Sequence, residues 1–153
     1  MVLPITLTLA GAATLLHIWL SVRVGRVRGQ TKIYVGDGGN EAVVRRMRAH
    51  ANFHENMPIV VILVGLLELA GADNRFLWGA VILFVLARIA HAFGMDRPSP
   101  SRFRMIGATG TGLVLVALAV WALSFAYRAP APHHDEIQIG PGRSAAVVPP
   151  RRS

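Results

Sequence analysis

The chain has 153 residues, of which 53% are hydrophobic, and it carries 16 Lys and Arg against 8 Asp and Glu, a net charge of +8. The length is enough for one domain, and the absence of cysteine excludes disulfides, a protein thiol nucleophile and thiolate metal ligands. The positive charge does not indicate a nucleic-acid partner, because most basic residues are gathered in two loops beside long apolar segments. We therefore predict an integral, multi-pass membrane protein.

The first apolar stretch, residues 2–22, predicts a membrane span within a helix over 2–28. No Lys or Arg precedes it, whereas Arg23, Arg26 and Arg28 follow it. This charge order is the reverse of that in a cleaved signal peptide. We expect the helix to be retained, with its N-terminus outside the cytoplasm.

Residues 29–40 are predicted to form a loop that ends in the turn sequence "DGGN", with Asn40 as the N-cap of a second helix over 41–70. The glycines lack the Walker pattern of a phosphate-binding loop, so a plain turn is the favoured interpretation. The second helix becomes continuously apolar only over 57–70.

A third helix is predicted over 75–95, with a span at 76–93, and Pro98 and Pro100 prevent it from continuing. A fourth is predicted over 102–127, with a span at 105–126. Its small residues, the pair Ala108 and Gly112 together with Gly107 and Gly110, favour close helix packing in lipid. The predicted fold is all-α, an up-down-up-down four-helix membrane bundle in one domain over 1–128. The Pro- and Gly-rich segment 129–153 is predicted to be disordered.

The distribution of positive charge predicts the topology. Two loop regions are basic, one containing Arg23, Arg26, Arg28, Lys32, Arg45, Arg46 and Arg48 and the other Arg97, Arg102 and Arg104. By the positive-inside rule both lie in the cytoplasm, so both termini lie outside it.

The second helix carries a polar stripe next to its apolar part. The stripe consists of Glu41, Arg45, Arg48, Asn52, Glu55 and Asn56, which share about a third of the helix circumference. Because 57–69 spans only about 20 Å, the turns before it lie near the membrane boundary and need protein or ligand partners. Two interpretations remain open. The stripe is either a solvated helix end with internal ion pairs, or a site in which Arg, Glu and Asn bind the carboxylate, ammonium and amide of a small zwitterion.

Other ionisable residues are less informative. His50 and His54 point away from the stripe in the order H-x-x-x-H-E, which is not a zinc-protease motif, and no third ligand is close in sequence. We therefore predict no metal site there, nor at His133, His134 and Asp135. Two intramembrane residues, Glu68 and Arg88, are expected to form an inter-helix ion pair or polar contacts at a protomer interface.

The segment "RAHANFHENMP" resembles the second-helix signature of the MAPEG superfamily, membrane-associated proteins in eicosanoid and glutathione metabolism. The four spans, "LARIAHAFG" late in the third helix and the Arg-rich third loop agree with it. The resemblance covers residues 5–127 and is nearest to a small bacterial branch, so a bacterial inner membrane is expected. It implies a homotrimer in membrane lipid that binds glutathione between protomers near the cytoplasmic face.

The resemblance also implies roles for individual residues. Arg48, Asn52 and Glu55 match glutathione-contacting positions, and Arg28 or Arg26 matches a basic residue at the end of the first helix. Arg104 or Arg102 matches an arginine that activates the thiol. Three further candidates depart from the family: His50 stands where relatives often have Gln, Asn56 where some have Tyr, and His91, together with Met95, where conjugating relatives have tyrosines.

The implied function is transfer of glutathione to lipophilic electrophiles, or its use to reduce peroxides. The alternative is a non-catalytic lipid-binding or scaffolding protein of the same fold, which the missing tyrosines favour. Whether the chain is an enzyme is therefore left open. A transporter is not favoured, because the sequence has neither a broken helix pair nor an inverted repeat.

Overall fold

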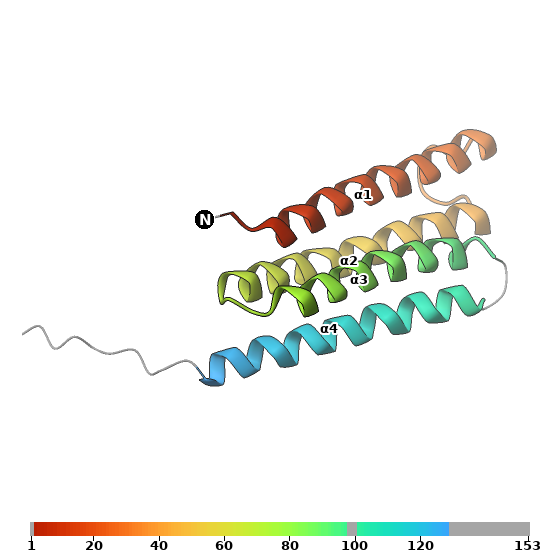
Figure 1. Cartoon of the computed structure of the whole chain (residues 1–153). Helices are drawn as coiled ribbons and strands as arrows, with labels where there is room; N and C mark the ends of the chain where they lie inside the picture. The colour runs from red at the N-terminus through yellow and green to blue at the C-terminus, as the bar shows by residue number, and fades with distance from the viewer. Residues whose placement is uncertain (1, 98–100, 129–153) are drawn as a thin grey trace, which may run out of the picture.

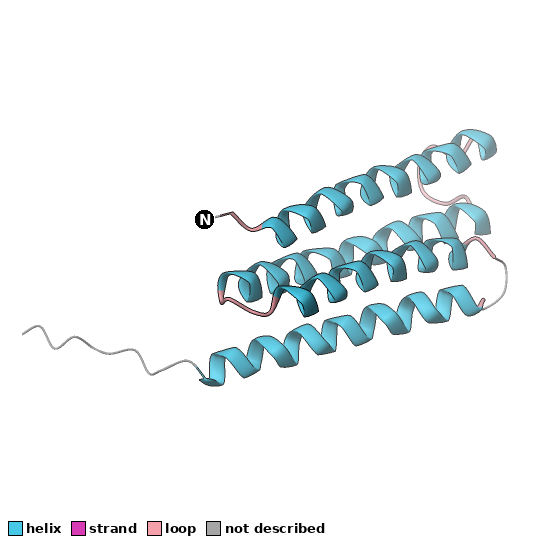
Figure 2. Cartoon of the chain, viewed as in Figure 1, coloured by secondary structure: helices cyan, strands magenta, loops and turns pink. Residues whose placement is uncertain are grey.

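A computed structural model of the chain describes residues 2–97 and 101–128, and these residues form four antiparallel helices (Figure 1). The helices are α1 (Pro4–Thr31), α2 (Glu41–Leu69), α3 (Asn74–Met95) and α4 (Arg102–Arg128). The described part of the chain contains no strand (Figure 2). All four helices are long and apolar enough to cross a membrane, which confirms the predicted four-helix membrane bundle.

The two basic loop regions lie at the same end of the bundle. The α1–α2 and α3–α4 connections are at one end, whereas the N-terminus, the α2–α3 turn and the end of α4 are at the other (Figure 1). The single-chain structure carries no membrane, so the predicted topology stays a prediction. The predictions for 129–153, for its His133-His134-Asp135 group and for Pro98 and Pro100 concern residues outside the described ranges.

The helix ends follow from local chemistry. The Asn40 side chain accepts hydrogen bonds from the backbone N–H groups of Ala42 and Val43, which confirms it as the N-cap of α2. Asp73 caps α3 in the same way through the N–H of Arg75, at 2.8 Å. The "DGGN" turn places Gly38 and Gly39 at positive φ, where glycine has no steric penalty.

The bundle buries one stripe of each helix and leaves much apolar surface outside. Its core includes Leu9 of α1, Val60 of α2, Phe84 of α3 and Leu118 of α4, each at most 1% exposed. The outer faces carry large exposed apolar side chains such as Leu15, Ile62, Leu86, Leu113 and Val116. Apolar residues on the outside as well as the inside are what lipid or another protomer requires of a spanning helix.

Glu68 caps a neighbouring helix. Its carboxylate accepts hydrogen bonds from the N–H groups of Ile5 and Thr6, at 2.9 and 2.8 Å, and from the Thr6 hydroxyl at 2.6 Å. The first N–H groups of a helix have no partner within the helix, and Leu3 at the N-cap offers no side-chain acceptor. Glu68 therefore supplies from α2 the cap that α1 lacks, and it does so without the ion pair that the sequence left open.

Arg88 joins three helices. From α3 it donates to the Thr111 hydroxyl of α4 at 3.2 Å and to the Asn52 side-chain oxygen of α2 at 2.9 Å. It is 3% exposed and pairs with no carboxylate in the described ranges. The expected ion pair is therefore not formed within these ranges, and the polar contacts of Arg88 join helices of one chain and not two protomers.

The basic end of the bundle is held by one carboxylate. Asp96, at the C-terminal end of α3, forms an ion pair with Arg23 of α1 and another with Arg46 of α2, the latter at 2.6 Å. Arg23 also lies over the Trp19 ring, with its guanidinium carbon 4.6 Å from the ring centroid. These two arginines, which the sequence assigned only to a basic loop region, tie α1, α2 and α3 together.

Helices α3 and α4 approach each other backbone to backbone at two glycines. A Cβ added to Gly94 would lie 2.2 Å from the Arg104 backbone nitrogen, and one added to Gly107 would lie 2.5 Å from the His91 backbone nitrogen. Ala108 and Gly112 were also predicted to allow close helix packing. They do not pack against another helix of the same chain, because Ala108 is exposed and nothing lies within 4 Å of a Cβ at Gly112.

Replacing Gly107 by Ala is expected to destabilise the bundle. The added methyl group would meet backbone atoms, which cannot rotate away, and such overpacking costs about 1–3 kcal/mol. The thermal midpoint of the Gly107→Ala protein in detergent should fall clearly. Gly112→Ala is the matched control on the same helix and should leave the midpoint unchanged or raise it. Equal midpoints for the two variants would contradict the assigned packing.

Candidate functional site

A cleft of about 420 Å³ opens among α2, α3 and α4, and its lining includes Arg48 near the start of α2, Met95 at the end of α3 and Arg104 at the start of α4. It is lined by Arg48, Ala51, Asn52, Glu55, His91, Met95 and Arg104. Three helices thus contribute charged or polar side chains to one concavity. Five of the ten site residues proposed from the sequence line it: Arg48, Asn52, Glu55, His91 and Arg104.

Helix α2 supplies one wall because its residues recur every three to four positions. Arg48, Asn52 and Glu55 therefore follow one another along one face. The stripe divides at this point, because Arg45 forms an ion pair with Glu41 one turn earlier, outside the cleft. The first part of the stripe, Glu41 and Arg45, is therefore a helix end with an internal ion pair. The later residues Arg48, Asn52 and Glu55 line a concave surface instead.

The side chain of Asn52 is oriented by hydrogen bonds to Arg88 and Glu55. Its side-chain oxygen accepts the hydrogen bond from Arg88, and its amide nitrogen donates toward Glu55 at 3.4 Å. With the oxygen directed to Arg88, the amide N–H groups are directed toward the acidic side of the cleft. Arg88 itself does not line the cleft. It positions a residue that does, and the sequence could not have shown this because the two are 36 positions apart.

Helix α3 supplies the second wall through His91 and Met95, which are four residues apart. Both are buried, and the His91 Nδ1 atom has no hydrogen-bond partner within the described ranges. These are the two positions at which the resemblance implies tyrosines in conjugating relatives. No hydroxyl side chain is among the described residues that line the cleft.

Helix α4 supplies Arg104, and this separates it from its neighbour Arg102. Both are exposed in the first turn of α4, but only Arg104 lines the cleft. The backbone of Arg104 is seated against Gly94, so its position relative to His91 is fixed by helix packing. Of the two arginines proposed from the sequence, only Arg104 is therefore at this cleft, and the role of either in activating a thiol stays a prediction.

The other candidates lie elsewhere in the single chain. Arg28 donates to the Ile33 carbonyl and contacts the Met47 sulfur, each at 3.2 Å, and Arg26 is exposed on α1. The Asn56 amide donates to the Asn52 carbonyl at 2.7 Å. None of these three lines the cleft, and their roles stay predictions.

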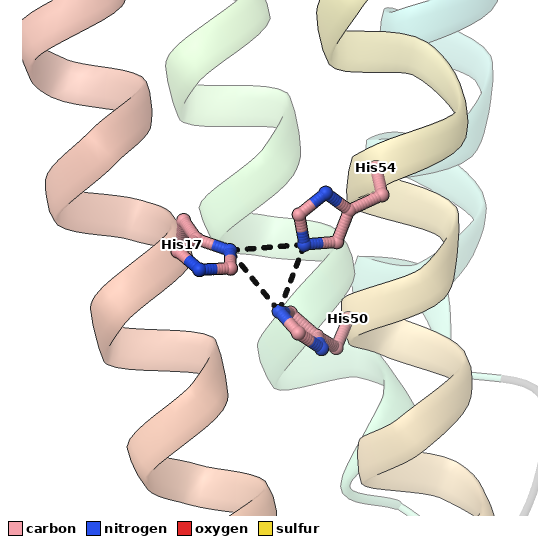
Figure 3. Close-up of side chains that lie close together, drawn as sticks. All are labelled: His17, His50 and His54. Atoms are coloured by element: carbon pink, nitrogen blue, oxygen red, sulfur yellow. Dashed lines mark hydrogen bonds between the residues drawn. The ribbon is translucent and has the colours of Figure 1, made fainter.

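His50 does not face the cleft either, because it contacts a residue that the sequence analysis missed. His17 of α1 lies within 3.2 Å of His50 and within 2.9 Å of His54, measured between ring nitrogens (Figure 3). No third metal ligand lies close to the H-x-x-x-H pair along the chain. The fold nevertheless brings His17 to His50 from 33 positions away. The ground on which we predicted no metal site is thereby removed.

Comparison with known proteins finds related membrane proteins. The model of the MAPEG family matches residues 6–124. The "Inner membrane protein YecN" of Escherichia coli strain K12 and that of strain CFT073 are each 31% identical to the chain over 123 residues, covering 76% of this chain and 93% of the relative. Together with the four spanning helices, these matches show an integral, multi-pass protein of the inner membrane.

Arg88 and Asn52 are expected to be energetically coupled. Replacing Arg88 by Met removes the donor that orients Asn52, and Asn52→Ala removes the acceptor. The loss in free energy of unfolding of the double variant should therefore be smaller than the sum of the losses of the two single variants, by about 0.5–3 kcal/mol. Unfolding in denaturant would measure the coupling. Arg75→Ala, at the other end of the bundle, should combine additively with Arg88→Met, and an additive Arg88–Asn52 pair would show that the hydrogen bond does not form.

Proposed function

The chain belongs to the MAPEG family, and from this premise we propose that the cleft binds glutathione and transfers it to lipophilic electrophiles or uses it to reduce peroxides. The observation that carries the proposal is the grouping of Arg48, Asn52 and Glu55 on one wall with Arg104 on another. Glutathione carries two carboxylates, an ammonium group, two amides and a thiol. The cleft offers a group suited to one carboxylate, to the ammonium group, to an amide and to the thiol.

Each of the polar residues in the cleft would bind a different group of glutathione. The Arg48 guanidinium would bind a glutathione carboxylate through its paired N–H donors. The Glu55 carboxylate would accept from the ammonium group, and the Asn52 amide, oriented by Arg88, would pair with a peptide group. The Arg104 cation would then lie beside the thiol, where a positive charge favours the thiolate over the neutral thiol.

The reaction follows from the thiolate. Its sulfur attacks an electrophilic carbon and forms a C–S bond, while the leaving group departs with the bonding electrons or, in an addition, the substrate takes up a proton. With a peroxide, two glutathiones are oxidised to the disulfide while the peroxide is reduced to an alcohol and water. The His91 ring lines the same cleft from α3 and would offer a hydrogen-bonding group at that wall.

A homotrimer would complete the site. In a single chain the second carboxylate of glutathione has no cation on the α1 side, because Arg26 and Arg28 lie outside the cleft. We propose that the end of a neighbouring protomer's α1 supplies that cation. The electrophile would arrive from membrane lipid over the apolar outer faces of the helices.

One observation favours a second candidate. Among the described residues no hydroxyl group lines the cleft, and Met95 gives its wall an apolar side chain. A protein that uses the same cleft to hold a lipid, without turnover, would not need a hydroxyl to stabilise a thiolate. Ligand binding and catalysis are therefore tested separately.

Glutathione binding is expected to depend on the charged wall of α2. In calorimetry on the full chain in lipid nanodiscs, Arg48→Ala and Glu55→Ala should each weaken binding by about 10-fold or more, since a hydrogen bond to a charged group contributes about 1.5–3 kcal/mol. Arg75→Ala controls for the loss of one positive charge and should bind as the parent does. If the parent protein binds no glutathione, or if all three variants bind equally, the cleft is not a glutathione site.

Turnover is expected to depend on Arg104 and not on Arg102. Arg104→Ala should lower kcat for conjugation or peroxide reduction by about 10- to 100-fold, with a smaller effect on glutathione affinity, because the cation acts mainly on the thiolate. Arg102→Ala is the matched control and should leave kcat unchanged. Glutathione binding without turnover over a broad panel of electrophiles and peroxides would establish the non-catalytic candidate.

A further inference from the structure

A second constellation of functional side chains lies between α1 and α2, apart from the cleft. His17 of α1 and His50 and His54 of α2 direct one ring nitrogen each toward a common point (Figure 3). The three nitrogens are Nδ1 of His17 and Nε2 of the other two, and their separations are 2.9, 3.0 and 3.2 Å. They form a nearly equilateral triangle.

Hydrogen bonding among the rings does not account for this triangle. Each ring nitrogen is either an N–H donor or a lone-pair acceptor. With two roles and three mutually close atoms, at least two neighbours must have the same role, so at least one of the three short contacts is repulsive. Protonating a ring adds another donor and does not remove the conflict. Three acceptor nitrogens around a shared cation satisfy all three contacts at once.

The dimensions of the triangle fit a metal ion. Zinc binds histidine nitrogen at about 2.0–2.1 Å. At that bond length, two ligand nitrogens are about 2.9 Å apart on an octahedral face and about 3.3–3.4 Å apart in a tetrahedral site. The observed edges of 2.9–3.2 Å lie within or close to this interval. Both Nδ1 and Nε2 are common ligand atoms for metals.

We propose that His17, His50 and His54 bind a divalent transition-metal cation such as Zn²⁺. Neutral imidazoles select metals of this class, whereas Mg²⁺ and Ca²⁺ prefer the oxygen ligands that the cluster lacks. Three protein ligands leave a fourth position for water or an anion, the arrangement found in catalytic zinc sites. The Ser21 hydroxyl lies 3.2 Å from the His50 Nε2 atom, which is one of the three nitrogens of the triangle.

The local sequence explains how the ligands meet. On α1, His17 and Ser21 are four residues apart, and on α2, His50 and His54 are four residues apart. Each pair therefore lies on one face of its helix, one turn above the other. A metal ion would join the two helices at mid-length of α1. The site is on the other side of α2 from Arg48 and Glu55, so the inference does not depend on the glutathione proposal.

The test uses the full-length chain without a polyhistidine tag, stripped with a chelator in nanodiscs. His133 and His134 are replaced by Ala throughout, so that the tail cannot supply ligands. Titration with Zn²⁺ against a chromophoric competitor should give one ion per chain. Loss of a residue that only hydrogen-bonds to a metal ligand lowers metal affinity by roughly 10- to 100-fold. Replacing His17, a direct ligand, by Asn in this background should weaken Zn²⁺ binding by more than that. Arg75→Asn, at the other end of the bundle and outside both the cluster and the cleft, is the control and should bind as the background does.

Two results would overturn the proposal: no stoichiometric Zn²⁺ binding by the tail-substituted chain, or equal binding after His17→Asn. If the His17→Asn variant does not fold, a second measurement on the folded tail-substituted chain tests the site instead. X-ray absorption of the Zn²⁺-loaded, folded tail-substituted chain should show three imidazole nitrogens at about 2.0–2.1 Å. Fewer than three imidazoles would rule the site out.

Discussion

The contact between α3 and α4 at Gly94 and Gly107 determines the geometry of the cleft. The two helix backbones meet where a side chain would normally separate them, with a hypothetical Cβ at Gly94 only 2.2 Å from the Arg104 nitrogen. Lipid gives little hydrophobic drive for helices to associate, so such close packing is a main source of their attraction. The result is that His91 and Arg104 face one cleft because two residues without side chains bring their backbones together.

Two ionisable residues within the helices, the part-buried Glu68 and the buried Arg88, extend this packing to the remaining helices. An ionisable group at membrane depth is costly unless it has partners, and the expected solution is an ion pair. This chain uses helix and side-chain dipoles instead. Glu68 accepts from the open N-terminus of α1, and Arg88 donates to Asn52 and Thr111. Glu68 satisfies open N–H groups of α1 while attaching α2 to it. Arg88 attaches α3 to α2 and α4 through side-chain hydrogen bonds.

The sequence predicted what depends on a single helix. Turn and capping chemistry placed Asn40 at the start of α2, and the 3.6-residue period placed Arg48, Asn52 and Glu55 on one face. The number and type of helices followed from the lengths of the apolar stretches. These signals are local, so they survive without knowledge of the neighbours.

Pairings between helices were not predictable in the same way. Periodicity shows which residues share a face but not which face meets which partner, so Ala108 and Gly112 looked as suitable for packing as Gly107. For the same reason His17 was not connected to His50 and His54, although all three are visible in the sequence. A search for histidines at four-residue spacing on one predicted helix, and for single histidines at matching depth on others, would have raised the possibility.

The polar segment at 45–58 of α2 is tolerated because each of its sides has a different partner. Phe53 and Met57 are buried in the core, His50 and His54 face α1, and Asn52 is held by Arg88. Arg48 and Glu55 remain exposed in the single chain, and the sequence predicts that they lie near the membrane boundary. Charges at that depth need water, headgroups, a ligand or another protomer, because lipid tails offer no hydrogen bonds. A ligand between protomers would meet this need on the cleft side, and a bound cation would do so on the histidine side.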